Sequence, residues 1–411
     1  MQSKYIPAYL LTLVNVLGFG LLLPVLPFVV QDYGGGDVMY GVLLSSYSAF
    51  QFLGAPWLGR LSDSTGRKPI LLITQVGTLV AWVVFGLAWF LPDIKIGVVA
   101  LPLLVIAISR MLDGITGGNH SVTQAYVSDI SSRQEKSYIF ANVGGVAGLG
   151  FIIGPGLGGL LASTQIGYLA VAICGFAISV VTLLSIQLSL KESLPLDSRK
   201  PHEKQSISQS FRLLKRIKRL KPSQVVKRLF LLRALFSAMM AAYIATIALF
   251  IIDLFALDER GLGLFMLVVG IFMILNQIVV SKWFIRHFGE ATTLRMGLFL
   301  CIAGLFLITM TKNFWLYVVY YYVLNLGVSL ATPTFNALIA QNGRPQDMGE
   351  VMGISSSFVS ISNAVLPVCA TFIYASLGAV FFNLIAILPA VALLLAFGLN
   401  LGGSNSDESH V

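Results

Sequence analysis

Charged residues are scarce in this chain. Only 11% of its 411 residues are Asp, Glu, Lys or Arg, 56% are hydrophobic, and the mean hydropathy is +0.85. A soluble domain of this size needs more charge on its surface, so lipid must cover much of this protein. The hydrocarbon offers no water to backbone groups, and the apolar runs are continuous rather than alternating. We therefore predict transmembrane α-helices rather than a barrel.

Cysteine and recognisable catalytic patterns are equally scarce. The three cysteines, Cys174, Cys301 and Cys369, all lie inside apolar runs, which predicts buried thiols rather than disulfides or a metal site. The P-loop pattern is absent, which argues against an ATP-driven pump, and no cluster of His, Asp and Glu indicates a membrane enzyme. We therefore expect no catalytic residue, no metal and no cofactor.

Negative charge is the scarcer sign, since the net charge is +9. Most of the excess lies in Lys191–Arg228, where twelve Lys and Arg residues face three acids. This placement argues for a cytoplasmic loop under the positive-inside rule and against a nucleic-acid partner. Within it, Phe211–Lys221 separates apolar residues from cations at helical spacing, which predicts an amphipathic helix on the inner leaflet or on the bundle. A regulatory partner site there stays open.

Twelve apolar segments are long enough to cross a membrane. Six precede the basic stretch: Pro7–Val30, Tyr40–Leu58, Pro69–Leu91, Ile96–Val127, Tyr138–Ala162 and Ile166–Leu188. Six follow it: Leu229–Ala256, Leu262–Ile285, Thr292–Met310, Phe314–Ala340, Val351–Ala375 and Leu377–Leu401. The halves resemble a repeat, since Pro155 in the fifth segment is matched by Pro367 in the eleventh. We predict an all-α membrane protein of two pseudo-symmetric six-helix bundles, working as a monomer.

The loops assign an orientation. One set carries Lys4, Arg60, Arg67, Lys68, Arg133, Lys136, the basic stretch, Lys282, Arg286, Arg295 and Arg344, whereas the other carries only Lys95, Arg260 and Lys312. The first set is predicted to be cytoplasmic, with both termini, in the plasma (inner) membrane. The predicted domains are an N-terminal bundle (1–190), a linker (191–228), a C-terminal bundle (229–401) and a short cytoplasmic tail (402–411).

The loop after the second segment carries the sharpest motif, running Gly59-Arg-Leu-Ser-Asp63-Ser-Thr-Gly66-Arg67-Lys68-Pro69. Glycines allow a tight turn between two antiparallel spans. Asp63 is able to meet a helix N-terminus or to pair with Arg67, and such a charge network is able to latch one conformation. A plain cytoplasmic turn fits the same residues, so both interpretations stay open.

Here the chain resembles the major facilitator superfamily, whose signature at this place is Gly-x-Leu-x-Asp-x-x-Gly-Arg-Lys/Arg. The family's Arg-x-x-x-Gly motif in the fourth span is matched by Arg110 and Gly114, and the fifth span carries the antiporter-type motif of Gly150, Gly154, Pro155, Gly158 and Gly159. Gly18–Pro27 resembles the drug/proton antiporter branch, and Tyr40–Leu44 and Ala55–Gly59 are similar to the tetracycline-resistance exporters. The resemblance implies alternating access, with the solute bound between the halves and the fifth-span glycines either packing tightly or sealing against leak.

Polar residues of the fourth segment recur on one helical face: Arg110, Asp113, Gly117, His120 and Gln124 fall within an arc of about 80°. Charges at membrane depth are functional by default, so we expect Asp113 to carry a proton while Arg110 favours its ionised form. His120 is a further candidate for proton coupling. The alternative is a structural pair of Arg110 and Asp113, with His120 merely hydrogen-bonded.

Two departures from the family pattern matter. Aligned with the tetracycline exporters, the chain has Asn15 and Ala81 where those proteins have carboxylates, and its ninth segment contains no acid. A tetracycline–cation site and the family's usual proton path are therefore in doubt. In the second half, aligning Gly289 on Gly66 places Arg286 opposite Asp63, so the latch is predicted to be one-sided.

The candidate substrate-binding residues are the polar and aromatic side chains of the cavity-lining spans. They are Asn15, Tyr47, Gln51, Gln124, Tyr243, Asn276, Gln277, Asn325, Asn336, Ser357, Ser360 and Asn363. Each is alternatively a helix–helix hydrogen bond, worth roughly 0.6–2 kcal/mol. So few charges favour a lipophilic or amphipathic small-molecule solute.

The leading functional hypothesis is a proton-coupled exporter of drug-like molecules, with protons and membrane lipid as its other partners. A lipid or glycolipid translocator, or an uncoupled facilitator of the same fold, is the alternative. A solute sensor is less favoured, because residues 402–411 form only a short tail.

Overall fold

The protein is described by a computed structural model, which covers residues 3–132, 135–199, 217, 220, 222–344 and 347–398. The predicted amphipathic helix Phe211–Lys221, apart from Ile217 and Leu220, lies outside the described residues, as does the predicted tail at 402–411. Continuous apolar sequence folds almost entirely into helix, as the sequence predicts, because each backbone group then finds its partner within its own segment.

In the first part of the chain, the described residues form eight α-helices and one small hairpin. The α-helices are α1 (Ile6–Leu22), α2 (Leu26–Asp32), α3 (Asp37–Thr65), α4 (Arg67–Leu87), α5 (Leu101–Gly117), α6 (His120–Ile130), α7 (Lys136–Ala162) and α8 (Tyr168–Ser189). Short 3₁₀ turns are η1 (Ser3–Tyr5), η2 (Ala88–Phe90) and η3 (Leu196–Ser198), and the antiparallel hairpin is β1 (Lys95–Ile96) with β2 (Val99–Ala100).

The later part of the chain is helical too. Its elements are α10 (Gln224–Phe255), α11 (Glu259–Leu275), a π-helical segment η5 (Asn276–Val280), α12 (Ser281–Leu307), α13 (Phe314–Asn342), α14 (Met348–Leu377), α15 (Val380–Ile385) and α16 (Ile387–Phe397).

Twelve membrane crossings follow from these helices. Ten continuous helical stretches of the described chain are long and apolar enough to cross, and the bent pair α1–α2 adds one more. One stretch, Glu259–Leu307, has 49 residues and a non-helical break at Gly289. At 1.5 Å per residue it is more than twice as long as the roughly 30 Å hydrocarbon core, so it accounts for two crossings. The predicted fold class is thereby confirmed.

Several boundaries differ from the prediction for local reasons. The hairpin Lys95–Ala100 occupies the expected start of the fourth span, because Gly97 adopts φ 65° and allows a tight turn. That span is also broken between α5 and α6, at Gly118 and Asn119. The first span bends by 43° between α1 and α2, where Pro24 and Pro27 remove backbone donors.

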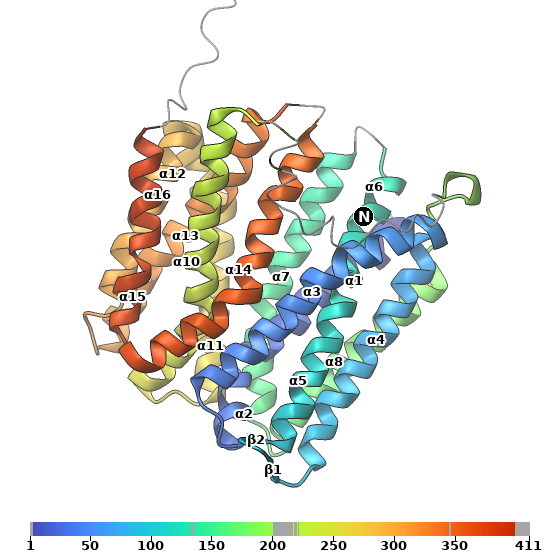
Figure 1. Cartoon of the computed structure of the whole chain (residues 1–411), viewed down its shortest axis with the longest axis horizontal. Coiled ribbons are helices and arrows are strands. Elements are labelled where there is room, and N and C mark those ends of the chain that lie inside the picture. The colour runs from blue at the N-terminus through green and yellow to red at the C-terminus, as the bar shows by residue number, and fades with distance from the viewer. Residues whose placement is uncertain are drawn as a thin grey trace, which may run out of the picture. The chain divides into compact units, whose positions relative to one another are not determined.

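The described chain forms two compact units. Unit 1 comprises Met1–Phe211, Ala245–Gly270 and Asn363–Ala375, and it holds α1 to α8. Within it, α4 packs against both α5 and α8, α3 packs against α5, and α1 packs against α7. Figure 1 shows α4, α5 and α8 running side by side. These units do not follow the predicted halves, whose boundaries stay a prediction.

A buried apolar cluster anchors the end of unit 1 that carries Gly59–Pro69, a segment that is helical except at Gly66 rather than the predicted loop. Leu11, Leu58, Leu71, Val122 and Ile186 pack there, from α1, α3, α4, α6 and α8. Because α3 turns into α4 at Gly66, between Leu58 and Leu71, the cluster holds the two helix ends on either side of this turn in place. We call this end of unit 1 the loop end and the opposite one, with β1 and β2, the hairpin end.

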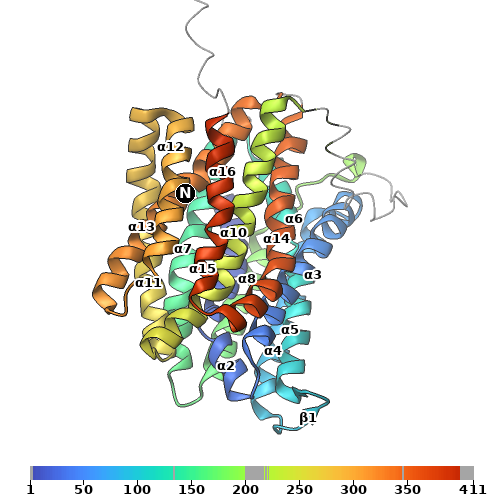
Figure 2. The ribbon, with the colours of Figure 1, turned by 60° about the vertical axis from the view of Figure 1, so that its left-hand side comes forward.

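Unit 2 comprises Arg212–Ile244, Ile271–Ser362 and Ser376–Val411. Within it α12 packs against α13, and α16 also packs on α12 (Figure 2). Glycines allow the α12–α13 approach: a side chain at Gly304 would meet the backbone of Leu324, and one at Gly297 would lie 2.9 Å from the Ala331 nitrogen. Gly289, with φ 72°, turns the chain as Gly66 does in unit 1, with φ 107°, which matches the alignment of the two loops.

Candidate functional site

An ion pair lies within the membrane-spanning part of unit 1. Arg110 and Asp113 are on α5, and their Nη1 and Oδ2 atoms are 3.3 Å apart. Both residues are buried, at 2% and 7% exposure. The guanidinium carbon is 5.6 Å and 5.5 Å from the ring centres of Trp82 and Phe85 on α4. Aromatic faces on one side and a carboxylate on the other therefore balance the buried cation.

The pair is only partly satisfied by hydrogen bonds. Arg110 Nη2 is 3.4 Å from Ser109 Oγ, whose own proton goes to the Ala81 carbonyl at 2.8 Å. The buried Arg110 Nε has no hydrogen-bond partner among the described residues. Buried Arg110 has one unused donor and is stabilised mainly by the Asp113 carboxylate. A change in the charge of Asp113 therefore changes the free energy of burying Arg110.

Tyr47 and Gln51, two candidate binding residues, lie on α3 beside this pair. Gln51 Nε2 donates to Tyr47 Oη and to the Gly117 carbonyl, both at 3.3 Å. The close approach requires glycine on α5: a Cβ at Gly117 would lie 3.1 Å from Tyr47 Oη, and one at Gly114 would collide with the Tyr47 carbonyl. The glycine of the fourth-span motif thus lets α3 reach the charged face of α5.

A second polar chain crosses the break between α5 and α6. Asn15 Nδ2 on α1 donates to Asn119 Oδ1 at 2.7 Å, and Asn119 Nδ2 donates to Thr74 Oγ1 on α4 at 3.2 Å. Asn119 is fully buried. Asn15 therefore belongs to an uncharged chain of hydrogen bonds.

His120 and Gln124 lie beyond this break and contact each other. Their Nε2 atoms are 2.9 Å apart on the first turns of α6. The sequence predicts that one uninterrupted helix carries the polar stripe from Arg110 to Gln124. This prediction is wrong, because α5 ends at Gly117 and α6 begins at His120. The structure brings Arg110 and Asp113 together and leaves His120 in a separate contact.

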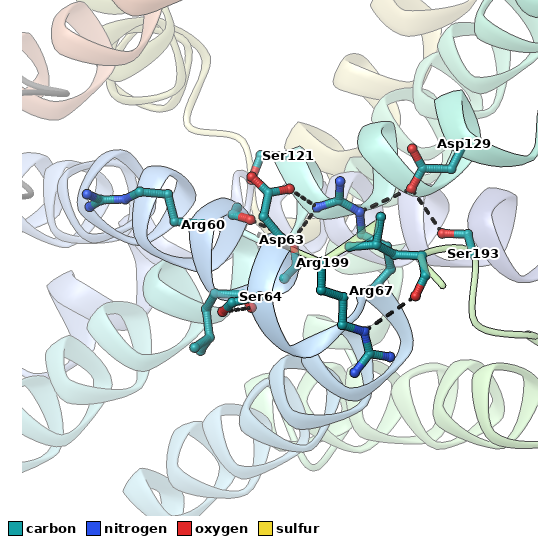
Figure 3. Close-up of polar contacts among 12 residues, drawn as sticks. Arg60, Asp63, Ser64, Arg67, Ser121, Asp129, Ser193 and Arg199 are labelled. Carbon is teal, nitrogen blue, oxygen red and sulfur yellow. Dashed lines mark hydrogen bonds and ion pairs between the residues drawn. The ribbon is translucent and has the colours of Figure 1, made fainter. Parts of the chain in front are cut away.

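The loop motif forms a charge network at the loop end (Figure 3). Arg67 Nη1 is 2.6 Å from Asp63 Oδ1, and its Nε is 3.2 Å from Asp129 Oδ2 at the end of α6. Ser62 accepts a further bond from Arg67 at 2.6 Å, and Ser193 donates to Asp129 at 3.0 Å. The Arg67 guanidinium thus links α3 to α6, and Asp129 connects the network to Ser193 in the segment after α8.

Glu192 completes this network by accepting backbone donors. Its carboxylate accepts from the Arg67 nitrogen at 2.9 Å and the Lys68 nitrogen at 3.1 Å, at the start of α4. It also accepts from the Ser193 and Leu194 nitrogens, both at 3.0 Å. A carboxylate at a helix N-terminus satisfies free N–H groups and complements the helix dipole. Gly66 leaves room for it, because a side chain there would meet the Glu192 carboxylate.

Replacing Arg67 by glutamine should slow transport about tenfold without changing substrate affinity. Under the latch interpretation, the change removes both ion pairs of a mostly buried guanidinium and destabilises the latched conformation by roughly 1–2 kcal/mol. Initial rates over a range of substrate concentrations in proteoliposomes measure it. Lys95→Gln, at the exposed hairpin, is the matched charge-removing control. A wild-type rate in Arg67→Gln would leave only the plain-turn interpretation.

The glycines of the fifth span present two faces within unit 1. On one face, Cβ atoms at Gly150 and Gly154 would lie 3.2 Å from the Leu17 nitrogen and 2.9 Å from Gly20 Cα, and one at Gly158 would collide with Leu21 of α1. On the other, Gly159 meets Gly263 of α11, where a Cβ would lie 2.7 Å from its Cα. Pro155 is inside α7, and its carbonyl also faces Gly263. The motif allows α7 to touch two helices at backbone distance.

In unit 2, several candidate binding residues satisfy one another. Asn276 Nδ2 donates to Asn325 Oδ1 at 3.2 Å, and Asn276 Oδ1 accepts from Tyr322 at 3.0 Å. Tyr243 donates to Tyr321. Asn276 starts the π-helical segment, a distortion that is frequent at functional sites.

The remaining candidates make few contacts. The hydroxyls of Ser357 and Ser360 donate to carbonyls of their own helix, those of Gly353 and Ser356. Within the described chain no hydrogen bond is made by the side chains of Gln277, Asn336 and Asn363, which are partly or fully exposed. The structure therefore leaves these three able to meet a solute.

Sequence reasoning missed several residues of these sites. Asp129, Glu192 and Asn119 lie far from the motifs that they complete, and only folding brings them there. An acid at the end of the fourth span and another directly after the sixth were the available signals. Within the described residues no group of three or more His, Cys, Asp and Glu is placed to hold a metal ion.

Comparison with known proteins identifies the relatives. The family model "Major Facilitator Superfamily" matches residues 8–367. The class H tetracycline resistance protein of Pasteurella multocida is 28% identical, covering 97% of this chain and 96% of its own. The class D protein of Salmonella ordonez is 29% identical, covering 91% and 90%.

Solved structures share the fold. The human organic anion transporter MFSD10 matches with a TM-score of 0.71 and 23% identity, covering 96% of this chain and 99% of its own. A bacterial homologue of the human lysosomal transporter Spinster, in an inward-facing and unoccupied conformation, matches with a TM-score of 0.72 and 14% identity, covering 97% of each chain. At such low identities, these matches show a shared fold and give no information about the solute.

Proposed function

Since the chain belongs to the major facilitator superfamily and is a transporter of that type, we propose that it is a proton-coupled exporter of lipophilic or amphipathic small molecules. The buried pair of Arg110 and Asp113 carries this proposal. Apart from Asp253 near one end of the seventh span, Asp113 is the only acid within the twelve predicted spans. A proton path through the membrane therefore has one internal carboxylate on which to depend.

The coupling step is a charge change at one ion pair. When the cavity opens outward, Asp113 takes a proton. Its carboxyl group becomes neutral, while Arg110 keeps its positive charge. Arg110 is then left with a spare charge and with the unpaired Nε, so the arrangement on α5 must change. When the cavity opens inward, the proton leaves and the ion pair re-forms. The latch around Arg67 would stabilise one of the two conformations.

The relatives support export and leave the solute open. The tetracycline resistance proteins named above are similar along nearly the whole chain. The resemblance places Asn15 and Ala81 where tetracycline exporters have carboxylates, so a different solute from the tetracycline–cation complex is expected. In this proposal the protein lies in the plasma (inner) membrane with the loop end and both termini in the cytoplasm.

Flux through proteoliposomes with an imposed pH gradient tests the proposal. Tetracycline is the first probe, because the relatives are named for it, and the neutral lipophile N-phenyl-1-naphthylamine is the second. Flux that follows the gradient and stops when an ionophore collapses it supports coupled export. Flux of the same size without a gradient would identify an uncoupled facilitator, and pH-independent movement of a labelled lipid would identify a translocator.

A further inference from the structure

Unit 2 contains a cation that proton coupling does not use. Arg233 is the tenth residue of α10, about 13 Å along the helix from Gln224. From residue 234 to residue 252 the helix has no charged side chain, a length close to the roughly 20 residues that cross the hydrocarbon. Arg233 therefore stands where the apolar part of the span begins.

One phenylalanine contacts this side chain, and two others precede and follow it by one turn on the same face of α10. The Arg233 guanidinium carbon lies 5.8 Å from the ring centre of Phe335 on α13. Phe335 packs on Phe236, one turn further along α10, with centroids 5.2 Å apart. One turn earlier, Phe230 packs on Phe358 of α14 at 6.0 Å. Residues three apart share a helix face, so the cation lies in an aromatic frame from three helices.

Arg233 has no acceptor in the described part of the chain. Its Nε is buried without a hydrogen bond, and no carboxylate of the described residues pairs with its guanidinium. The neighbouring arginines differ. Arg228 donates to the Gly398 carbonyl at 2.9 Å, and Arg295 donates to the Ala396 carbonyl at 3.2 Å and 3.1 Å, both at the end of α16. A guanidinium offers five donors, and burying its Nε without an acceptor is costly, so a ligand that supplies acceptors would stabilise it.

We infer that Arg233 binds the anionic group of an amphipathic molecule, a carboxylate, sulfonate or phosphate monoanion attached to an apolar body. The flat guanidinium donates two parallel bonds to such a group. The partly exposed Phe358, which packs on Phe230 one turn before Arg233, offers the apolar body an aromatic surface. This inference rests on the proposed function for the role of the ligand as transported solute, whereas binding itself is measured without transport.

Two dyes that differ by one anionic group test the inference directly. 1-Anilinonaphthalene-8-sulfonate carries a sulfonate, and N-phenyl-1-naphthylamine is the same molecule without it. The full chain is placed in nanodiscs of zwitterionic phosphatidylcholine, and fluorescence titrations are corrected with empty nanodiscs. Arg233→Gln should weaken binding of the sulfonate at least roughly tenfold, because a charge-assisted hydrogen-bonded pair is lost, and should leave binding of the neutral dye unchanged. Arg233→Lys should restore most of the sulfonate affinity.

Arg228→Gln is the matched control. It removes a cation from the same helix, but this cation already donates to the Gly398 carbonyl. It should leave both dyes unaffected. Equal losses for the two dyes in Arg233→Gln, or wild-type affinity for the sulfonate, would overturn the inference.

The anion could belong to a solute or to a lipid headgroup. Adding phosphatidylglycerol to the nanodiscs separates the sources. Competition with the sulfonate in the wild type but not in Arg233→Gln would assign the site to lipid phosphate, and absence of competition assigns it to the solute. Sulfonate binding that depends on Arg233 without gradient-driven flux would refute the proposed coupled export and leave the anion site intact.

Discussion

Asp113→Asn is expected to reduce gradient-driven transport to the level of protein-free liposomes, while Asp113→Glu retains a measurable part of it. Asparagine cannot exchange a proton, whereas glutamate keeps the carboxylate one methylene further along the side chain. The measurement is the initial flux of the substrate in proteoliposomes at several imposed pH gradients. Substrate binding without a gradient should persist in both variants, since the change removes coupling rather than the solute site.

Loss of folding is the competing explanation, and the ion pair allows a check. Asp113→Asn leaves Arg110 buried without a counter-ion, which costs about 3–5 kcal/mol in comparable buried pairs. The double variant Arg110→Gln with Asp113→Asn removes both charges and should recover most of the thermal stability. If stability returns and coupling does not, loss of folding is excluded as the cause and the charged pair itself is required.

Asp253→Asn supplies the matched control. Asp253 is the other acid of the predicted spans, is exposed, and accepts a hydrogen bond from Tyr374 at 2.8 Å within unit 1. We expect this variant to keep its response to the pH gradient. Undiminished gradient-driven flux in Asp113→Asn, or its loss in Asp253→Asn alone, would move the coupling site away from the fourth span.

The sequence was sufficient for the fold because each span must satisfy its own backbone. Composition, span length and loop charge depend only on local stretches, so twelve crossings could be predicted without knowing any contact. The boundaries were harder to place. The break between α5 and α6 at Gly118 and Asn119 is set by packing, since a side chain at Gly118 would lie 2.6 Å from the Ala55 nitrogen on α3.

The site was predictable only where its chemistry is local. Arg110 and Asp113 are three residues apart on one helix, and Asp63 and Arg67 flank a single turn. Their spacing in the sequence alone therefore predicts each pair. Their partners come from distant segments. Asp129 and Glu192 contact Arg67 from 62 and 125 positions away in the sequence. No local sequence pattern predicts contacts between such distant residues.

Gly158→Leu is expected to abolish transport and to lower the melting temperature. A Cβ at this position already collides with the Leu21 backbone, so a leucine must push α1 away from α7. Overpacking of this kind typically costs about 1–3 kcal/mol. The α1–α7 contact also carries Asn15 toward Asn119, so the shift should disturb the polar chain beside the coupling pair. Gradient-driven flux and thermal unfolding in detergent measure the two effects.

Gly145→Leu is the matched control, because nothing lies within 4 Å of a Cβ at that exposed position of the same helix. It should transport and unfold as the wild type does.

The smaller change Gly158→Ala then separates packing from sealing, the two roles that the fifth-span glycines are able to have. A variant that folds and binds substrate but lets protons leak through substrate-free proteoliposomes assigns the contact to the seal. A lower melting temperature with an unchanged proton leak assigns it to packing, and wild-type behaviour of Gly158→Leu in both assays would deny it either role.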